Sequence, residues 1–275
     1  MIDHKDTGGH LSGDPIDAPP ASAPAAVPDP DPAPWGLAGA ILGPAMAFGG
    51  QVLLATFMAL FTRGILIRLD PNLIDQEEAL DKLVIQSSLL PVGLGSALLT
   101  VGLVCLSIRI AGDRPFGEAL GLKAPTAASA GFVIAGMAVA LVAVGLVVLF
   151  PPGDLEEIGG PMTDLARSGP LGQAIWILLA VGVAPIVEEI LFRGYAFAGA
   201  KRRLGAVGAG AGCTIVFVSM HLGETGLFWP AIAGITAVAV LLVVIVHRTG
   251  NLTHCIACHL GYNAALAALS LMGGE

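Results

Sequence analysis

Three clusters of polar side chains interrupt apolar stretches in the second half of this 275-residue chain. In chain order they are Glu188, Glu189 and Arg193 in "EEILFR", His221 at the end of "FVSMH", and His259 with Asn263 in "HLGYN". Carboxylates and imidazoles can exchange protons near neutral pH, whereas amides and cations stabilise developing negative charge. Together these residue types could perform acid–base hydrolysis, provided that the fold brings them to one place.

The first cluster follows the apolar stretch Leu171–Val187, and apolar residues resume after it. If one helix continues through, three ionisable groups lie inside the membrane, where each costs roughly 2.5–3.5 kcal/mol and is expected to be paired and functional. Glu189 and Arg193 are four residues apart and can pair on one helix face. Glu188 lies about 100° round the helix and stays free for chemistry. The alternative, a helix that ends before the charges, is disfavoured because "ILFRGYAFAGA" is too apolar for a solvated loop.

His221 lies in the next apolar stretch, at the same predicted depth as Glu188. The midpoint of the two positions falls on the polar turn "KRRLGAVG", so a helix hairpin about this turn places each residue about 16 positions, or roughly 25 Å, from it. A single histidine in a membrane helix often bonds only to a neighbouring helix. Two polar groups that lack partners in their own helices and meet at one depth instead predict a site.

The third cluster follows the polar turn "HRTGN" at the start of a further apolar helix. His259 and Asn263 are four residues apart, so they lie on one face of that helix. His259 comes eight residues after Asn251, about 12 Å into the membrane at 1.5 Å per residue. This depth is shallower than that of Glu188 and His221, and helix tilt or a longer turn is needed to absorb the difference.

The composition indicates that these clusters lie in a bilayer protein. Hydrophobic residues make up 55% of the chain, only 12% are charged, and the mean hydropathy is +0.81, whereas soluble domains carry about a quarter charged residues. A span needs about 20 apolar residues, and seven stretches qualify, at approximately 36–61, 83–110, 128–150, 171–200, 204–222, 228–246 and 252–272. The predicted fold is all-α, a polytopic membrane helix bundle of about seven transmembrane helices over 35–275. Residues 1–34, rich in Pro, Ala and Asp, are predicted to be a disordered tail.

The distribution of Lys and Arg predicts the orientation of this bundle. Nine of the 13 fall on the side of the N-terminus and the "KRR" turn, and four fall on the other side. The positive-inside rule therefore places the N-terminus in the cytoplasm, and the Ala- and Gly-rich composition with short loops favours a bacterial plasma membrane. The site is expected to open toward the cytoplasmic side. The lipid bilayer is the expected environment, and no basic patch indicates a nucleic-acid partner.

In this order, E-E-x-x-x-R (188–193), F-x-x-x-H (217–221) and H-x-x-x-N (259–263) resemble the CAAX prenyl endopeptidase and bacteriocin-processing family, also called the Abi family, of intramembrane glutamate-type proteases. Any one of these motifs alone is weak, but three in order, each in a separate apolar helix, are a specific signal. The resemblance covers about residues 171–266. "FGEALGLK" (116–123) also looks like the loop that precedes the core of this family.

The resemblance implies an endopeptidase that needs no cofactor and acts on a membrane-associated protein or peptide. It implies these roles: Glu188 as general base on a water, His221 as the group that holds and polarises this water, His259 and Asn263 as donors to the oxyanion, and Glu189 with Arg193 as a structural pair that orients the site. Apolar surroundings make a carboxylate take up a proton more readily, which suits it to act as a general base near neutral pH. They also strengthen the hydrogen bonds that donors make to an oxyanion. The substrate is left open among a prenylated C-terminus, a bacteriocin leader and a membrane regulator.

A catalytic zinc ion is the first alternative for the same residues. Glu188, His221 and His259 together make a His₂Glu ligand set, which is known from zinc hydrolases. The chain has no H-E-x-x-H motif, and the metal-free roles also account for Asn263. Metal-free catalysis is therefore the favoured prediction.

A covalently attached haem is the second alternative, because Cys255, Cys258 and His259 spell C-x-x-C-H. A membrane c-type cytochrome would explain these three residues and leave the other two clusters without a role. Haem attachment also needs an exported, accessible segment, whereas this motif lies in an apolar helix. All four cysteines lie in apolar stretches, which favours buried thiols.

Two further classes of function stay open: a non-catalytic immunity or scaffold protein of the same fold, and a transporter that uses the buried charges for ions. The presence of every motif residue favours an enzyme over these. Replacing Glu188 by alanine separates the classes, because a protease should lose its function while the protein still accumulates in the membrane.

Overall fold

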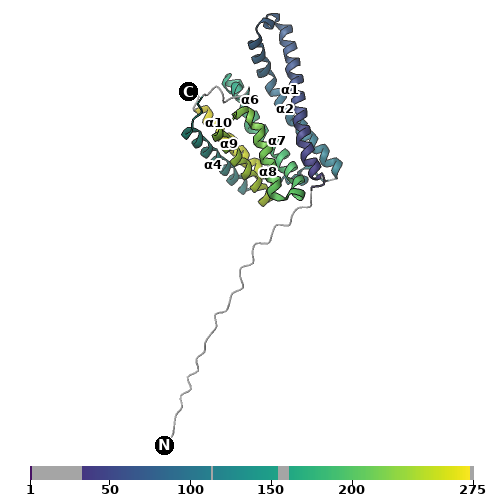
Figure 1. Cartoon of the computed structure of the whole chain (residues 1–275), viewed down its shortest axis with the longest axis vertical. Coiled ribbons are helices and arrows are strands. Elements are labelled where there is room, and N and C mark those ends of the chain that lie inside the picture. Colours follow the sequence, from purple (N-terminus) through teal and green to yellow (C-terminus); the bar gives the residue numbers. More distant parts are fainter. Residues whose placement is uncertain (2–32, 113, 154–160, 273–275) are drawn as a thin grey trace. The chain divides into compact units, whose positions relative to one another are not determined.

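The structure, a computed structural model, describes Met1 and residues 33–112, 114–153 and 161–272. Within these residues the regular elements are all helices, which confirms the predicted all-α class. Figure 1 shows them as a bundle of long helices. The predicted disordered tail, 1–34, falls almost entirely outside the described residues.

Six helical stretches in the described chain are long and apolar enough to cross a membrane. They are α1 (Gly36–Leu69), α2 (Glu77–Ala111), α4 (Ala127–Leu149), the stretch Pro170–Thr225, α9 (Trp229–Thr249) and α10 (Leu252–Met272). Shorter helices lie between them: η1 (Pro71–Asp75), α3 (Phe116–Ala119) and α5 (Pro161–Arg167). The bundle is therefore polytopic, as predicted.

The predicted number of seven spans is not confirmed, because the fourth and fifth predicted segments form one helical stretch of 56 residues. Such a stretch is about 84 Å long, far beyond a hydrocarbon core of about 30 Å. The backbone leaves helical geometry at Gly205 (φ 66°, ψ 171°), a conformation that glycine adopts without strain. Beyond it the chain folds back, since the Phe217 ring packs edge-on against Phe192 at 5.5 Å. The predicted hairpin is present, and Gly205 is its turn.

The first arm of this hairpin consists of α6 (Pro170–Ile177), η3 (Leu178–Val183), α7 (Ala184–Glu189) and η4 (Ile190–Ala196), and it continues into α8 (Phe197–Thr225). η3 and η4 are π-helical turns. Pro185 lacks an N–H and its ring crowds the preceding turn, which favours the wider winding of η3. Because π-helical turns change which side chains share a face, the two turns set the direction of the glutamates in α7.

The backbones of α4 and α10 lie almost in contact. A Cβ added to Gly261 would be 2.2 Å from the carbonyl oxygen of Val133, and one added to Gly136 would be 1.8 Å from that of Cys258. Only glycine allows helices to approach this closely. This contact fixes the position of α10, the helix that carries His259.

The turn between α9 and α10 is recessed beneath the segment that precedes α4. The Leu252 N–H donates to the carbonyl of Gly121 over 2.9 Å, and Asn251 is only 5% exposed. α10 therefore begins inside the protein rather than at its surface. This recess explains how His259 reaches the depth of Glu188 although it lies only eight residues after Asn251.

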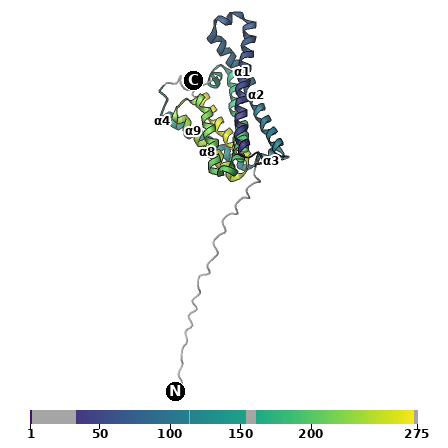
Figure 2. The same ribbon diagram turned by 45° about the vertical axis from the view of Figure 1, so that its right-hand side comes forward.

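The start of α1 is fastened to η4 by aromatic contacts. The Trp35 ring stacks on Tyr195 at 4.8 Å, and its Nε1–H donates to the Tyr195 carbonyl over 3.0 Å. The Tyr195 hydroxyl in turn contacts Ser107 of α2. From this end α1 and α2 run side by side and extend past the other helices (Figures 1 and 2).

Candidate active site

Glu189 and Arg193 form a buried ion pair one helical turn apart. Arg193 Nη1 donates to Glu189 Oε1 over 3.0 Å, and both side chains are 0% exposed. Arg193 Nη2 also donates to the carbonyl of Ala239 on α9 over 3.2 Å, and the guanidinium carbon lies 4.6 Å from the centre of the Phe217 ring. Buried charges need such partners, and here three helices supply them.

His259 joins the pair through the same carboxylate. Its Nδ1 lies 2.9 Å from Glu189 Oε1, so this oxygen accepts hydrogen bonds from both the imidazole and the guanidinium. The opposite ring nitrogen, Nε2, faces Oε2 of Glu188 at 3.8 Å. That separation is too long for a direct hydrogen bond, and a polar atom of a water or a substrate could bridge it.

Glu188 is the accessible carboxylate of the site. Its side chain is 24% exposed, whereas that of His259 is 4% exposed and that of Glu189 is fully buried. Glu189, Arg193, His221 and His259 are the ionisable side chains near enough to Glu188 to act on it electrostatically. These four side chains come from α7, η4, α8 and α10.

His221 approaches from α8, on the other side of an aromatic ring. The Phe217 ring centre is 4.6 Å from that of His221 and 5.8 Å from that of His259. His221 Nδ1 bonds to the Phe217 carbonyl within its own helix over 2.8 Å. With Nδ1 engaged, Nε2 is the ring atom that can contact water or substrate.

Asn263 lies one turn beyond His259, but the structure directs its amide elsewhere. Nδ2 donates to the carbonyl of Ala180, in η3, over 2.7 Å. The π-helical turn there alters the helix hydrogen bonds, and Asn263 supplies a donor to this backbone oxygen. Asn263 therefore ties α10 to η3, and the second N–H of its amide is left over from this bond.

Two contacts escape sequence reasoning. The spacing of Glu189 and Arg193 predicts their pairing, but the bond from Glu189 to His259 crosses between helices and depends on how each helix is rotated. The bond from Asn263 to Ala180 depends on a backbone carbonyl, which has no signature in the residue types. Pro185, which widens the preceding turn, is the one sequence signal for the irregular backbone around the site.

The proposed zinc ligand set does not fit this geometry. No three His, Cys, Asp or Glu side chains of the described residues are placed to share a metal ion. The Phe217 ring lies against both His221 and His259. Metal-free hydrolysis stays a prediction that rests on the side chains themselves.

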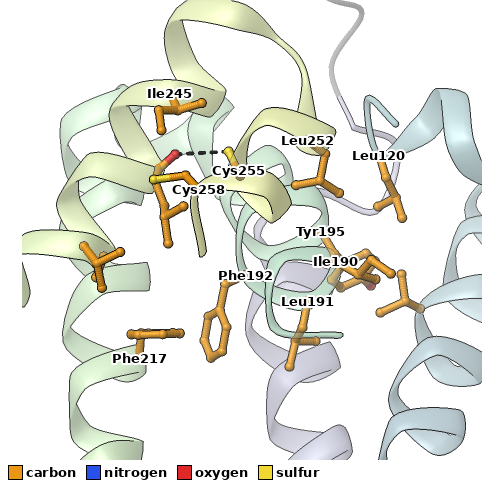
Figure 3. Packing of buried hydrophobic residues seen from close by; sticks show 14 of the residues in the cluster. Leu120, Ile190, Leu191, Phe192, Tyr195, Phe217, Ile245, Leu252, Cys255 and Cys258 are labelled. Atoms are coloured by element: carbon orange, nitrogen blue, oxygen red, sulfur yellow. Dashed lines mark hydrogen bonds between the residues drawn. The ribbon is translucent and has the colours of Figure 1, made fainter. Parts of the chain in front are cut away.

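The two cysteines of the C-x-x-C-H motif are packed inside the bundle. Cys255 and Cys258 are both 0% exposed, and Cys255 Sγ lies 3.4 Å from the carbonyl of Leu242. Figure 3 shows both thiols among the apolar side chains of the core, near Ile245. A porphyrin could not reach them without unpacking α10, which disfavours a cytochrome.

The motif-bearing part of the chain also matches a known protein family. Residues 170–265 match the family described as type II CAAX prenyl endopeptidase Rce1-like. This range holds all six residues of the three clusters. No curated protein and no protein of solved structure shows a significant match to the chain.

Proposed function

Because residues 170–265 match the family described as type II CAAX prenyl endopeptidase Rce1-like, we propose that this chain is an intramembrane endopeptidase whose water is activated by Glu188. The observation that carries this proposal is the meeting of Glu188 and His259 across two helices at 3.8 Å. A carboxylate partly open to its surroundings faces a ring nitrogen there, with a fully buried ion pair behind them. The proposed substrate is a protein or peptide associated with the membrane.

In the proposed reaction Glu188 removes a proton from water, and the water oxygen attacks the carbonyl carbon of the scissile bond. The carbonyl oxygen becomes an oxyanion, which accepts hydrogen bonds from His259 Nε2 and the remaining amide N–H of Asn263. The C–N bond then breaks, and Glu188 returns its proton to the leaving nitrogen. His221 holds the attacking water through its Nε2.

Donation from His259 Nε2 requires a proton on both ring nitrogens, because Nδ1 already faces the carboxylate of Glu189. In that state the ring and Arg193 carry two positive charges, and the two glutamates carry two negative ones. The sum is zero, which is the arrangement that costs least in an apolar bundle. Glu189 thus acts as a positioning residue that supports the donor.

The proposal is tested by replacing Glu188 with glutamine, which keeps the shape of the side chain and removes the base. We expect cleavage products in the membrane peptidome of expressing cells to fall by about 10²-fold or more, while the protein still accumulates. Glu77→Gln, at an exposed position on α2, is the matched control and should leave the products unchanged. Unchanged products with Glu188→Gln would refute the role of Glu188 as general base. If cells that express the unsubstituted protein also lack cleavage products, a scaffold, an immunity protein or a transporter would be favoured.

A further inference from the structure

Three turns rich in Lys and Arg lie at one end of the bundle, which we call the basic end. They contain Lys123, Arg202 and Arg248. The first and third are in contact, because the Leu252 N–H bonds to the Gly121 carbonyl. The turn at Arg202 joins them through Phe197, whose ring packs edge-on against His247 at 6.5 Å.

Between the candidate site and the basic end the protein is closed. Every residue of η4 is buried, and so are the positions of α8 and α10 that face it. This layer, which we call the plug, is visible in Figure 3 and includes Leu191, Phe192, Tyr195, Phe217, Leu252, Cys255 and Cys258, none more than 5% exposed. Neither water nor a peptide can reach Glu188 through such packing.

In the opposite direction residues of the same three helices are exposed. Beyond Glu188, on the side of α6, Ile186 is 40% exposed and the half-buried run 180–184 follows. Beyond His221, Gly223 and Glu224 are exposed, and beyond His259, Asn263 is half-buried and Ala264 is exposed. On the first arm and on α10 the change from buried to exposed occurs at the site, whereas α8 also exposes Ile215 and Met220 on the basic side of His221.

A recess explains this change. α8 ends at Thr225, four residues or about 6 Å beyond His221, whereas the arm from Glu188 back to Pro170 extends 18 residues, or about 27 Å. α8 also packs along η4 rather than along α7. The turn after Thr225, from which α9 begins, therefore lies well below the start of α6, and the site lies just beneath it.

This accessible end also differs from the basic end in charge, and we call it the acidic end. Of the described Lys and Arg outside the site, seven lie at the basic end and four at the acidic end: Arg109, Arg114, Lys123, Lys201, Arg202, Arg203 and Arg248 against Arg63, Arg68, Lys82 and Arg167. The acidic end carries the described carboxylates Asp70, Asp75, Glu77, Glu78, Asp81, Asp164 and Glu224. By the positive-inside rule the basic end faces the cytoplasm.

We infer that the active site is sealed from the cytoplasm by the plug and opens at the acidic, extracytoplasmic end of the bundle. This inference rests on the proposed function and names its substrate class: a polypeptide segment displayed at the outer surface of the membrane, such as part of an exported, membrane-anchored peptide. It replaces the cytoplasmic opening expected from the sequence, because the turn at Asn251, on the cytoplasmic side, is recessed and covered.

Cysteine accessibility tests the inference without any need for cleavage. Ala184→Cys places a thiol one turn before Glu188 on the same face, and Glu224→Cys and Arg202→Cys mark the two ends, all in a Cys105→Ser background. A membrane-impermeant methanethiosulfonate is added to intact cells or to inverted membrane vesicles. In intact cells, Ala184→Cys and Glu224→Cys should react at least about tenfold faster than the native, buried Cys258, since thiol modification follows exposure. Arg202→Cys should react only in inverted vesicles.

Modification of Ala184→Cys only in inverted vesicles, or from neither side, would overturn the inference, as would reversed labelling of the two end markers. Val181→Cys, one further turn toward the acidic end, replaces Ala184→Cys if that variant does not accumulate. The same labelling in a Glu188→Gln background should be unchanged. A failure of the access route is therefore distinguishable from a failure of the proposed catalysis.

Discussion

Glu189 is the residue on which the geometry of the site depends, because one of its oxygens accepts hydrogen bonds from both Arg193 and His259. Its other oxygen, Oε2, has no hydrogen-bond partner among the described residues. A carboxylate buried this deeply would be costly alone. The positive charge of Arg193 offsets the free energy of burying this carboxylate. The hydrogen bond with Glu189 then holds the His259 ring with Nε2 toward Glu188.

Replacing Glu189 with glutamine should separate positioning from stability. The change leaves the fully buried Arg193 without its counter-charge, which should cost about 3–5 kcal/mol of unfolding free energy. It also frees the His259 ring, and misplacement of a catalytic group by about 1 Å can lower turnover by about 10²-fold. Thermal unfolding in detergent and turnover are the two measurements.

The double variant Glu189→Gln/Arg193→Met is the matched control for that experiment. Removing both charges should restore most of the stability, since apolar replacements of a buried pair are often neutral. Turnover should stay low, because His259 still lacks its partner. Recovery of turnover together with stability would mean that Glu189 acts only through Arg193 and does not position the ring.

The positions of the helices along this chain are easier to predict than the way in which each helix is rotated about its own axis. Apolar length predicts the spans, and four-residue spacing predicts that Glu189 meets Arg193 and that His259 and Asn263 share a face. The π-helical turns around α7 change which residues face α10, and no periodicity reveals them. The depth of α10 likewise depends on a turn covered by the segment at Gly121, a tertiary contact that residue types do not encode.

Substitution of Gly261 by alanine tests how strongly α4 positions α10. The new Cβ would lie 2.2 Å from the Val133 carbonyl oxygen, so the helices must separate, at a cost of about 1–3 kcal/mol. We expect a lower midpoint of thermal unfolding and reduced turnover, because His259 moves with the helix. Gly145→Ala, on α4 with no atom within 4 Å of the new Cβ, should be neutral or slightly stabilising. Equal behaviour of the two variants would contradict this account of the contact.

At the scale of the molecule, the helices are of two lengths. α9 has 21 residues, about 31 Å, which matches a hydrocarbon core of about 30 Å. α1 and α2 have 34 and 35 residues, about 51 and 52 Å. Because the start of α1 and the end of α2 are fastened to η4 near the basic end, the extra length of about 20 Å must project at the acidic end (Figures 1 and 2).

This projection predicts which side of the membrane carries the closed end of the α1–α2 hairpin. A protease recognition sequence inserted after Asn72, in the exposed turn η1, should be cut by protease added outside intact cells or spheroplasts. The same insertion after Arg203, in the turn of the basic end, should be cut only in inverted vesicles. The cut halves should stay together, since α1 and α2 pack along their length and share the bond from Gln51 to Thr100. Cleavage after Asn72 only in inverted vesicles would reverse the orientation of the whole bundle, and the recess at His221 would then face the cytoplasm.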